Sequence, residues 1–169
     1  GALEAVTTVQ VGTQVSGIIK ELNVDFNSIV RKSQVIARLD PSLFETQVEQ
    51  ARANLVRSQA DVERLRVTVE DARSKLTRAE ELSVKNLIPR SELESAQVAV
   101  KAADAQLRSS QAQVTQAQAS LNQSQVNLDH TVISAPINGI VISRSVDVGQ
   151  TVAASLSSPT LFIIAADLT

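Results

Sequence analysis

Residues 48–83 read VEQARANLVRSQADVERLRVTVEDARSKLTRAEELS and contain neither glycine nor proline. Small and apolar residues recur in this stretch in a strict alternation of three and four positions, which is the heptad pattern of a coiled coil. One heptad position holds Val48, Leu55, Val62, Val69, Leu76 and Ser83, and the other holds Ala51, Ser58, Leu65, Ala72 and Ala79. The pattern predicts one long helix with a single apolar seam.

A second stretch, residues 93–128, repeats the pattern. Its two seam positions hold Leu93, Val100, Leu107, Val114, Leu121 and Leu128, and Ala96, Ala103, Ser110, Ala117 and Ser124. Only the short segment Lys85-Asn86-Leu87-Ile88-Pro89 separates the two stretches, and so short a connection makes neighbouring helices antiparallel. At about 1.5 Å per residue, each helix would be roughly 60 Å long.

Each predicted helix is preceded by residues that favour helix initiation. Asp40 can accept hydrogen bonds from free backbone N–H groups, and Pro41 suits the first helical position. Ser91 followed by Glu94 resembles a capping box, which would start the second helix. The helical part is therefore expected to cover residues 41–129.

The flanking segments, residues 1–40 and 130–169, are rich in valine and isoleucine and predict short strands. They also align with each other at one constant offset. The matched pairs are Gly17-Ile18-Ile19 with Gly139-Ile140-Val141, Val24-Asp25 with Val146-Asp147, Asn27 with Gly149, and Val30 with Val152. Each repeat would be a half-sheet that cannot bury its apolar face alone, so the two halves are expected to pack together.

This layout resembles the biotinyl- and lipoyl-carrier fold. The predicted fold class is α+β, with a lipoyl-like β-sandwich made of two half-motifs and a long antiparallel coiled-coil α-hairpin inserted between them. Carriers attach their cofactor to a lysine in the turn between the halves, and here the hairpin occupies that turn. Lys32 lies before the hairpin and is expected to be an ordinary solvated lysine, so no cofactor is expected.

Composition narrows the function classes further. The net charge is −2, without the clustered basic patch typical of nucleic-acid binding. The absence of cysteine excludes cysteine-based metal or redox sites, and His130 is the only histidine, so we expect no enzyme. No run of 18 or more apolar residues is present. The abrupt ends at Gly1 and Thr169 suggest a fragment of a longer protein.

Three segments resemble the periplasmic adaptors, or membrane fusion proteins, of the HlyD-like family, and the MacA-type macrolide efflux adaptors most of all. Residues 128–141, LDHTVISAPINGIV, are similar to the pattern L-x-x-T-x-I-x-A-P-x-x-G-x-V. Residues 11–17, VGTQVSG, are similar to the opening of MacA-type adaptors. Leu39-Asp40-Pro41 matches the junction between strand and hairpin. The resemblance extends over essentially the whole chain.

The resemblance implies a periplasmic protein that links an inner-membrane transporter to a TolC-like outer-membrane channel. MacA-type adaptors pair with a MacB-like ABC transporter and form hexameric funnels. The family also has a β-barrel, a membrane-proximal domain and an inner-membrane anchor. Residues 1–6 and 161–169 would lead into that barrel, so the first half-motif is expected within residues 1–40 and the second within 130–169.

The family grips the channel through an R-x3-L-x6-S motif at the hairpin tip. Arg78 and Leu82 match this motif, whereas Pro89 stands at the serine position and lacks a side-chain hydrogen-bond donor. Some MacA-type adaptors also carry a glutamine in the loop that corresponds to residues 153–158. Leu156 takes that place, so a polar ring there is not implied.

Several alternatives remain open at this stage. The adaptor could serve a proton-driven RND pump or a type I secretion exporter, and a lipoyl or biotinyl carrier is a remote possibility. A plain structural coiled coil would explain the helices but not the repeated β segments. The acidic residues of the first helix alternate with arginines, as on a solvated surface, and do not suggest paired catalytic carboxylates.

Both helices carry a weaker apolar stripe on the side away from the seam. The stripe residues are Ala53, Ala60 and Val67 on the first helix, and Val98, Ala105, Ala112, Ala119 and Val126 on the second. Residues 109–128 contain no charge, which suits contact between helices. We expect hairpins to pack side by side into a ring of six. The simpler reading is that exposed alanines only favour helix formation.

Overall fold

The computed structural model describes residues 7–155 and 160–167. The chain forms two compact units. One unit contains residues 1–47 and 124–169 and holds every strand of the described part of the chain, and the other contains residues 48–123 of the helical hairpin. The two units are described separately below.

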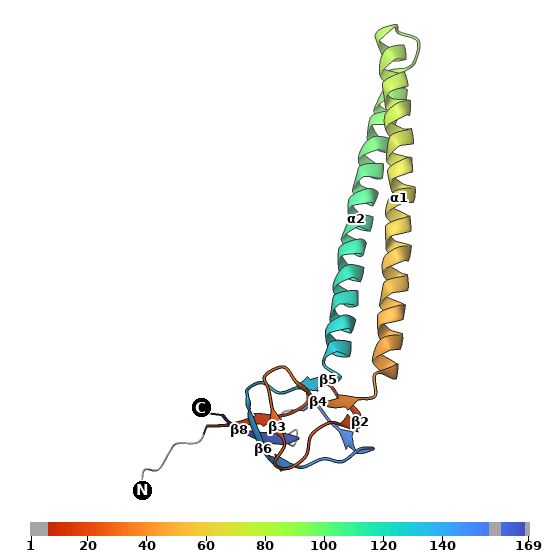
Figure 1. The fold of residues 1–169 in the computed structure, drawn as a ribbon. Helices are drawn as coiled ribbons and strands as arrows, with labels where there is room; N and C mark the ends of the chain where they lie inside the picture. The colour runs from red at the N-terminus through yellow and green to blue at the C-terminus, as the bar shows by residue number, and fades with distance from the viewer. Residues whose placement is uncertain (1–6, 156–159, 168–169) are drawn as a thin grey trace. The chain divides into compact units, whose positions relative to one another are not determined.

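The hairpin consists of helix α1 (Ser42–Val84) and helix α2 (Arg90–Asp129), which lie side by side (Figure 1). Every predicted seam position on both helices is buried or half-buried, which confirms the heptad assignment. One cluster in the seam joins Val69 and Ala72 of α1 to Ala103 of α2. The guanidinium of Arg73 lies 3.2 Å from the Asp104 carboxylate across the two helices, in agreement with an antiparallel pair.

The start of α1 is capped as predicted. The Asp40 carboxylate accepts hydrogen bonds from the backbone N–H of Ser42, at 3.0 Å, and from the Ser42 hydroxyl, at 2.7 Å. These two bonds lower the pKa of Asp40, because they favour its charged form. The start of α2 differs from the prediction. This helix begins at Arg90, so Ser91 lies inside the first turn and Glu94 pairs with Arg90 at 3.5 Å instead of completing a capping box.

One polar side chain in the seam lacks a partner. The Ser110 hydroxyl is buried, and it makes no hydrogen bond to any described residue. A buried hydroxyl without a partner carries a desolvation cost of about 1–3 kcal/mol. We therefore expect Ser110→Ala to raise the free energy of unfolding of the hairpin by about 1 kcal/mol, as measured by urea denaturation followed by circular dichroism.

The neighbouring Ser109 provides the control, because it is exposed on the same turn. Ser109→Ala should improve helix propensity only, by at most about 0.5 kcal/mol. Equal stabilisation by the two substitutions would show that the buried hydroxyl of Ser110 carries no cost.

Within the described residues, eight short strands form two antiparallel four-stranded sheets, with strand orders β1-β8-β6-β3 and β5-β4-β2-β7. The strands are β1 (Thr8–Val11), β2 (Gly17–Leu22), β3 (Ile29–Val30), β4 (Val35–Leu39), β5 (Val132–Ser134), β6 (Gly139–Arg144), β7 (Thr151–Val152) and β8 (Phe162–Ala166). Strands β2 and β3 align with β6 and β7 at one offset of 122 positions, as the sequence repeat predicts.

The two repeats exchange strands, and do not form one half-sheet each as expected. Strand β3 of the first repeat pairs with β6 of the second, and β7 of the second pairs with β2 of the first. The exchange is reciprocal in detail. The Asn27 N–H donates to the Val141 carbonyl and the Gly149 N–H to the Ile19 carbonyl, both at 2.8 Å. Asn27 and Gly149 both have positive φ, 67° and 89°, which confirms that asparagine replaces glycine at a left-handed position.

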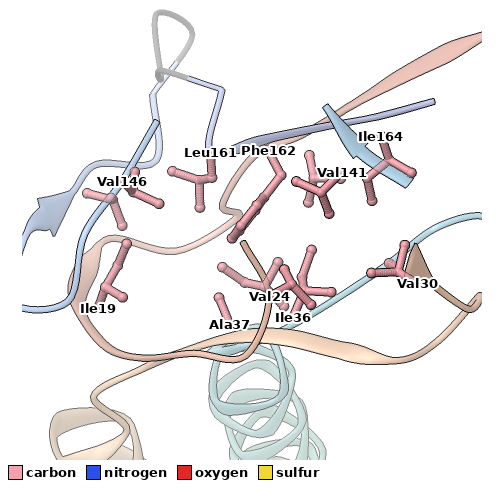
Figure 2. Packing of buried hydrophobic residues seen from close by; sticks show 14 of the residues in the cluster. Ile19, Val24, Val30, Ile36, Ala37, Val141, Val146, Leu161, Phe162 and Ile164 are labelled. Atoms are coloured by element: carbon pink, nitrogen blue, oxygen red, sulfur yellow. The ribbon is translucent and has the colours of Figure 1, made fainter. Parts of the chain in front are cut away.

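The core lies between the two sheets (Figure 2). Phe162 and Ile164 of β8 face Val24 and Ile36 across the interior, and Phe162 is fully buried. Strand β8 pairs with both β1 and β6, so residues 162–166 belong to the sandwich. That the chain ends lead towards a β-barrel stays a prediction, because residues 1–6 and 168–169 lie outside the described part.

One arginine links equivalent turns of the two repeats. The Arg144 guanidinium lies 3.0 Å from the Asp25 carboxylate and 3.3 Å from that of Asp147, and it also donates to the Val146 carbonyl. Asp25 and Asp147 are repeat equivalents, and each begins the turn that leads into an exchanged strand. A single cation therefore bridges the carboxylates of both turns.

Candidate functional site at the hairpin tip

The two helices are joined by a turn with defined geometry. The Leu87 N–H donates to the Leu82 carbonyl at 2.9 Å, and the Asn86 N–H donates to the Ser83 carbonyl at 3.0 Å. Asn86 has φ of 58°, in the left-handed region. This combination is a Schellman motif, in which the two bonds satisfy carbonyls at the end of α1. The tip turn is therefore hydrogen-bonded rather than an open loop.

A groove of about 500 Å³ lies between α1 and α2 beside this turn. Arg78 and Leu82 both line it, as expected for residues four positions apart on one helix face. Ile88 and Glu92 contribute from the other side of the turn. The remaining lining residues are Thr68, Asp71, Ala72, Lys75, Ala79, Ser95, Ala96, Ala99 and Ala103. The groove is thus lined by small residues, mostly alanines, and by charged residues of both signs.

The structure brings together two of the three tip residues that the sequence motif names. Arg78 is exposed and makes no ion pair within the described part of the chain, so its charge is available to a partner. Leu82 is half-buried in the groove wall. Pro89 is exposed and directly precedes α2, where its carbonyl accepts a bond from the Glu92 N–H at 3.1 Å.

Two further tip residues were missed by the sequence reasoning. Val84 is 84% exposed and Leu87 is 65% exposed, although both are large and apolar. Val84 is the last residue of α1, and Leu87 lies in the short connection that the sequence analysis treated only as a link between helices. A leucine directly after an asparagine at a helix end is the pattern that would have identified the turn.

These features match a known family. The model of the RND membrane fusion protein (MFP), barrel-sandwich hybrid domain, matches residues 7–164, which includes both repeats and the whole hairpin. The chain belongs to this family.

Curated relatives and solved structures of this membrane fusion family agree with the assignment. The macrolide export protein MacA of Yersinia pestis is 32% identical over 165 residues, which are 98% of this chain and 44% of that protein. The pyoverdine export membrane fusion protein PvdR of Pseudomonas aeruginosa is 36% identical over 165 residues, 98% of this chain and 42% of that protein. The crystal structure of MacA from Actinobacillus actinomycetemcomitans superposes with a TM-score of 0.88 at 29% identity and covers 96% of this chain and 52% of that chain.

The chain thus spans less than half the length of the curated MacA and PvdR proteins that it matches. In residues 7–155 and 160–167, neither helix has a segment long and apolar enough to cross a membrane. The same residues contain no cluster of three or more side chains suited to hold a metal ion.

The remaining predicted residues of this membrane fusion domain are placed as follows. All eight stripe residues on the outer helix faces are exposed, with Val67 and Val98 each 64% exposed. Leu156 lies outside the described residues. Lys32 is exposed, and its backbone N–H donates to the Asn138 side chain at 2.7 Å. His130 is half-buried and lines a hollow beside strands β1 and β5.

Proposed function

We propose that this chain is the central part of a periplasmic adaptor that bridges an inner-membrane ABC transporter, of the MacB-like kind, to a TolC-like outer-membrane channel in an efflux pump. It acts by binding and holds no catalytic site. The full protein would be anchored to the inner membrane through a segment beyond this chain. Both curated relatives given above are named as export proteins, MacA for macrolides and PvdR for pyoverdine, which supports this function.

The observation that carries the proposal is the tip geometry. Arg78 and Leu82 lie together on the groove at the end of the hairpin, and Arg78 has no acidic partner there. A cation without an intramolecular partner retains its capacity for charge-assisted hydrogen bonds to another protein. Pro89 contributes shape only, because its side chain cannot donate a hydrogen bond.

Replacing Arg78 by aspartate in the full-length protein tests this function. We expect cross-linking to the TolC-like channel in the periplasm to fall at least about tenfold, because reversing one charge in such a contact costs more than about 1.4 kcal/mol. The hairpin should remain folded, since Arg78 is exposed and pairs with no described carboxylate.

Arg57→Asp is the matched control. Arg57 occupies the same heptad position as Arg78, is exposed and lies far from the tip. This variant should cross-link as the unmodified protein does. If Arg78→Asp retains both channel cross-linking and drug resistance, the tip does not bind the channel.

A second class of transporter is a candidate for the inner-membrane partner. The description of the matching family names RND proteins, which favours an adaptor for an RND-type pump. Co-purification of the full-length protein with each candidate transporter from its own membrane distinguishes the two. If an RND pump is recovered with the adaptor and no ABC transporter is, the partner is the RND pump.

Self-association is part of the proposal. The stripes that include Ala60 on α1 and Ala112 on α2 are exposed, and small side chains allow two helices to approach closely. We propose that helix α1 of one hairpin packs on helix α2 of the next in a ring of six. Cysteines at both positions of the full-length protein should give ladders of disulfide-linked oligomers on oxidation. Variants that carry only one of the two cysteines should give no oligomers larger than dimers. If the variant with both cysteines stays monomeric on oxidation while transport is intact, the ring is contradicted.

A further inference from the structure

The two sheets of the sandwich each have an open edge beside the same hollow. Strand β1 is a terminal strand of one sheet and β5 is a terminal strand of the other, and each pairs on one side only within the described residues. A hollow of about 390 Å³ lies beside both strands, within one compact unit of the chain. It is called the edge hollow below, and its lining consists of residues 9–14 together with His130, Val132, Ile133, Ser134 and Pro136.

The backbone of β1 presents unpaired groups on the side away from its sheet. The Val11 carbonyl accepts a hydrogen bond from the Leu161 N–H at 2.9 Å, on the side of β8. The Thr7 carbonyl accepts one from the Ala166 N–H at 2.8 Å, on the same side. Successive residues of an antiparallel strand present their N–H and C=O groups to opposite sides, so Gln10 presents both groups away from β8. Gln10 is also one of the residues that line the edge hollow.

Strand β5 has the same arrangement. The Thr131 carbonyl accepts a hydrogen bond from the Leu39 N–H at 2.8 Å, on the side of β4. The Ala135 N–H donates to the Gln34 carbonyl at 2.8 Å, on the same side. Ser134, one position before Ala135, therefore presents its N–H and C=O away from β4, and it lines the edge hollow. The two strands thus offer hydrogen-bond donors and acceptors to one shared space.

The other two open edges of the sandwich are poorer templates for a further strand. Strands β3 and β7 contain two residues each, whereas β1 contains four and β5 contains three. Proteins commonly protect open edges with very short strands or with charged side chains. Neither β1 nor β5 contains a charged residue, and no Asp, Glu, Lys or Arg is found among the described residues that line the edge hollow. His130 is the only titratable side chain in that lining.

We propose that the edge hollow binds an extended, uncharged peptide segment of a partner protein, which adds as a strand between β1 and β5. Alternate residues of such a segment present their backbone groups to opposite sides, so one segment pairs with Gln10 and with Ser134 at once. A charged residue in the segment would lose its hydration without meeting an opposite charge. A four-residue strand spans about 13 Å, which matches the length of β1. This contact is separate from the channel contact proposed for the hairpin tip, and either can fail alone.

Hydrogen exchange of the purified full-length protein, resolved to single amides, tests the proposal directly. The probe is an end-blocked pentapeptide of alternating valine and threonine. Its matched control is the same peptide with every backbone nitrogen methylated, which leaves no backbone donor. With the probe at about 1 mM, exchange of the Gln10 and Ser134 amides should slow at least about tenfold, because both amides become hydrogen-bonded. The Val9 and Ile133 amides face β8 and β4, so their exchange should not change.

Substitutions at Gln10 separate backbone pairing from side-chain contact. Gln10→Pro removes the N–H that faces away from β8 and keeps the bonds to β8, and edge strands tolerate proline at such a position. It should weaken binding of the fluorescently labelled probe at least about tenfold, since a hydrogen bond is lost and the ring obstructs the added strand. Gln10→Ala keeps the N–H and should bind the probe within about threefold of the unmodified protein.

The proposal is overturned if the probe does not protect the Gln10 and Ser134 amides, or if its methylated copy protects them equally. Protection of the Gln10 amide that rises with protein concentration in the absence of peptide would also overturn it, because a second copy of the chain would then occupy the edge. Should Gln10→Pro unfold the sandwich in circular dichroism, the comparison of the two peptides decides the question alone. Equal loss of probe binding in Gln10→Ala and Gln10→Pro would show that side-chain contact, and not strand addition, holds the peptide.

Discussion

Replacing Phe162 by alanine is expected to destabilise the β-sandwich by about 3–5 kcal/mol, the usual cost of removing a buried phenylalanine. Phe162 is the largest fully buried side chain and lies in the middle of the core, between the two sheets (Figure 2). It also pairs with Val11 and Arg144 on neighbouring strands, so its backbone is held on both sides. The side chains around it cannot close the cavity without moving two strands.

Hydrogen exchange of strand amides is the suitable measurement, because the hairpin and the sandwich are separate units that need not unfold together. The Val141 N–H, bonded to the Ser28 carbonyl at 2.9 Å, reports on the core directly. Phe26→Ala is the matched control, since Phe26 is 61% exposed, and it should change stability by no more than about 0.5 kcal/mol. Equal exchange rates in the two variants would contradict the core assigned to Phe162.

The hairpin was predictable because a heptad repeat gives the sequence positions of the residues on the buried face of each helix. Every seam residue is at least half-buried, and the stripe residues on the opposite face are exposed. The start of α2 was not predictable from a capping motif. Serine and glutamate at the right spacing also occur inside a first turn, and here Pro89 and the ion pair between Arg90 and Glu94 define that turn.

The sandwich was predictable as a repeat but not as a set of strand pairs. A constant offset tells which residues are equivalent, and both left-handed turns, at Asn27 and Gly149, follow from it. It does not tell which strands pair, because half-sheets and exchanged strands satisfy the same apolar pattern. The exchange of β3 and β7 depends on long-range hydrogen bonds such as that from Asn27 to Val141, which no local pattern contains.

The candidate site was predictable only where a motif named its residues. Arg78 and Leu82 were identified by the tip motif of the family that the chain resembles, and both line the groove. Val84 and Leu87 were not, because exposure of an apolar residue depends on the turn that follows the helix. That turn is determined by the left-handed Asn86, whose conformation a sequence permits without requiring it.

The two repeat glycines differ in how much space they have, and this gives a paired test of the interleaved sheets. At Gly139 an added Cβ would overlap the carbonyl oxygen of Ala165 and lie 2.9 Å from Cγ2 of Ile164. Its equivalent, Gly17, would place a Cβ at 3.5 Å from Cδ1 of Leu39, an ordinary contact. The same substitution at equivalent positions should therefore have very different effects.

Gly139→Ala is expected to destabilise the sandwich by at least about 3 kcal/mol, because the obstacle is backbone of the paired strand β8 and cannot rotate away. The strands β6 and β8 must separate or slip to accommodate it, so amide exchange in both should accelerate together. Gly17→Ala should stay within about 1 kcal/mol, since a less flexible unfolded chain offsets any minor crowding. If both variants exchange alike, β6 does not approach β8 as closely at Gly139 as the register Gly139 to Ala166 and Ile140 to Ala165 requires.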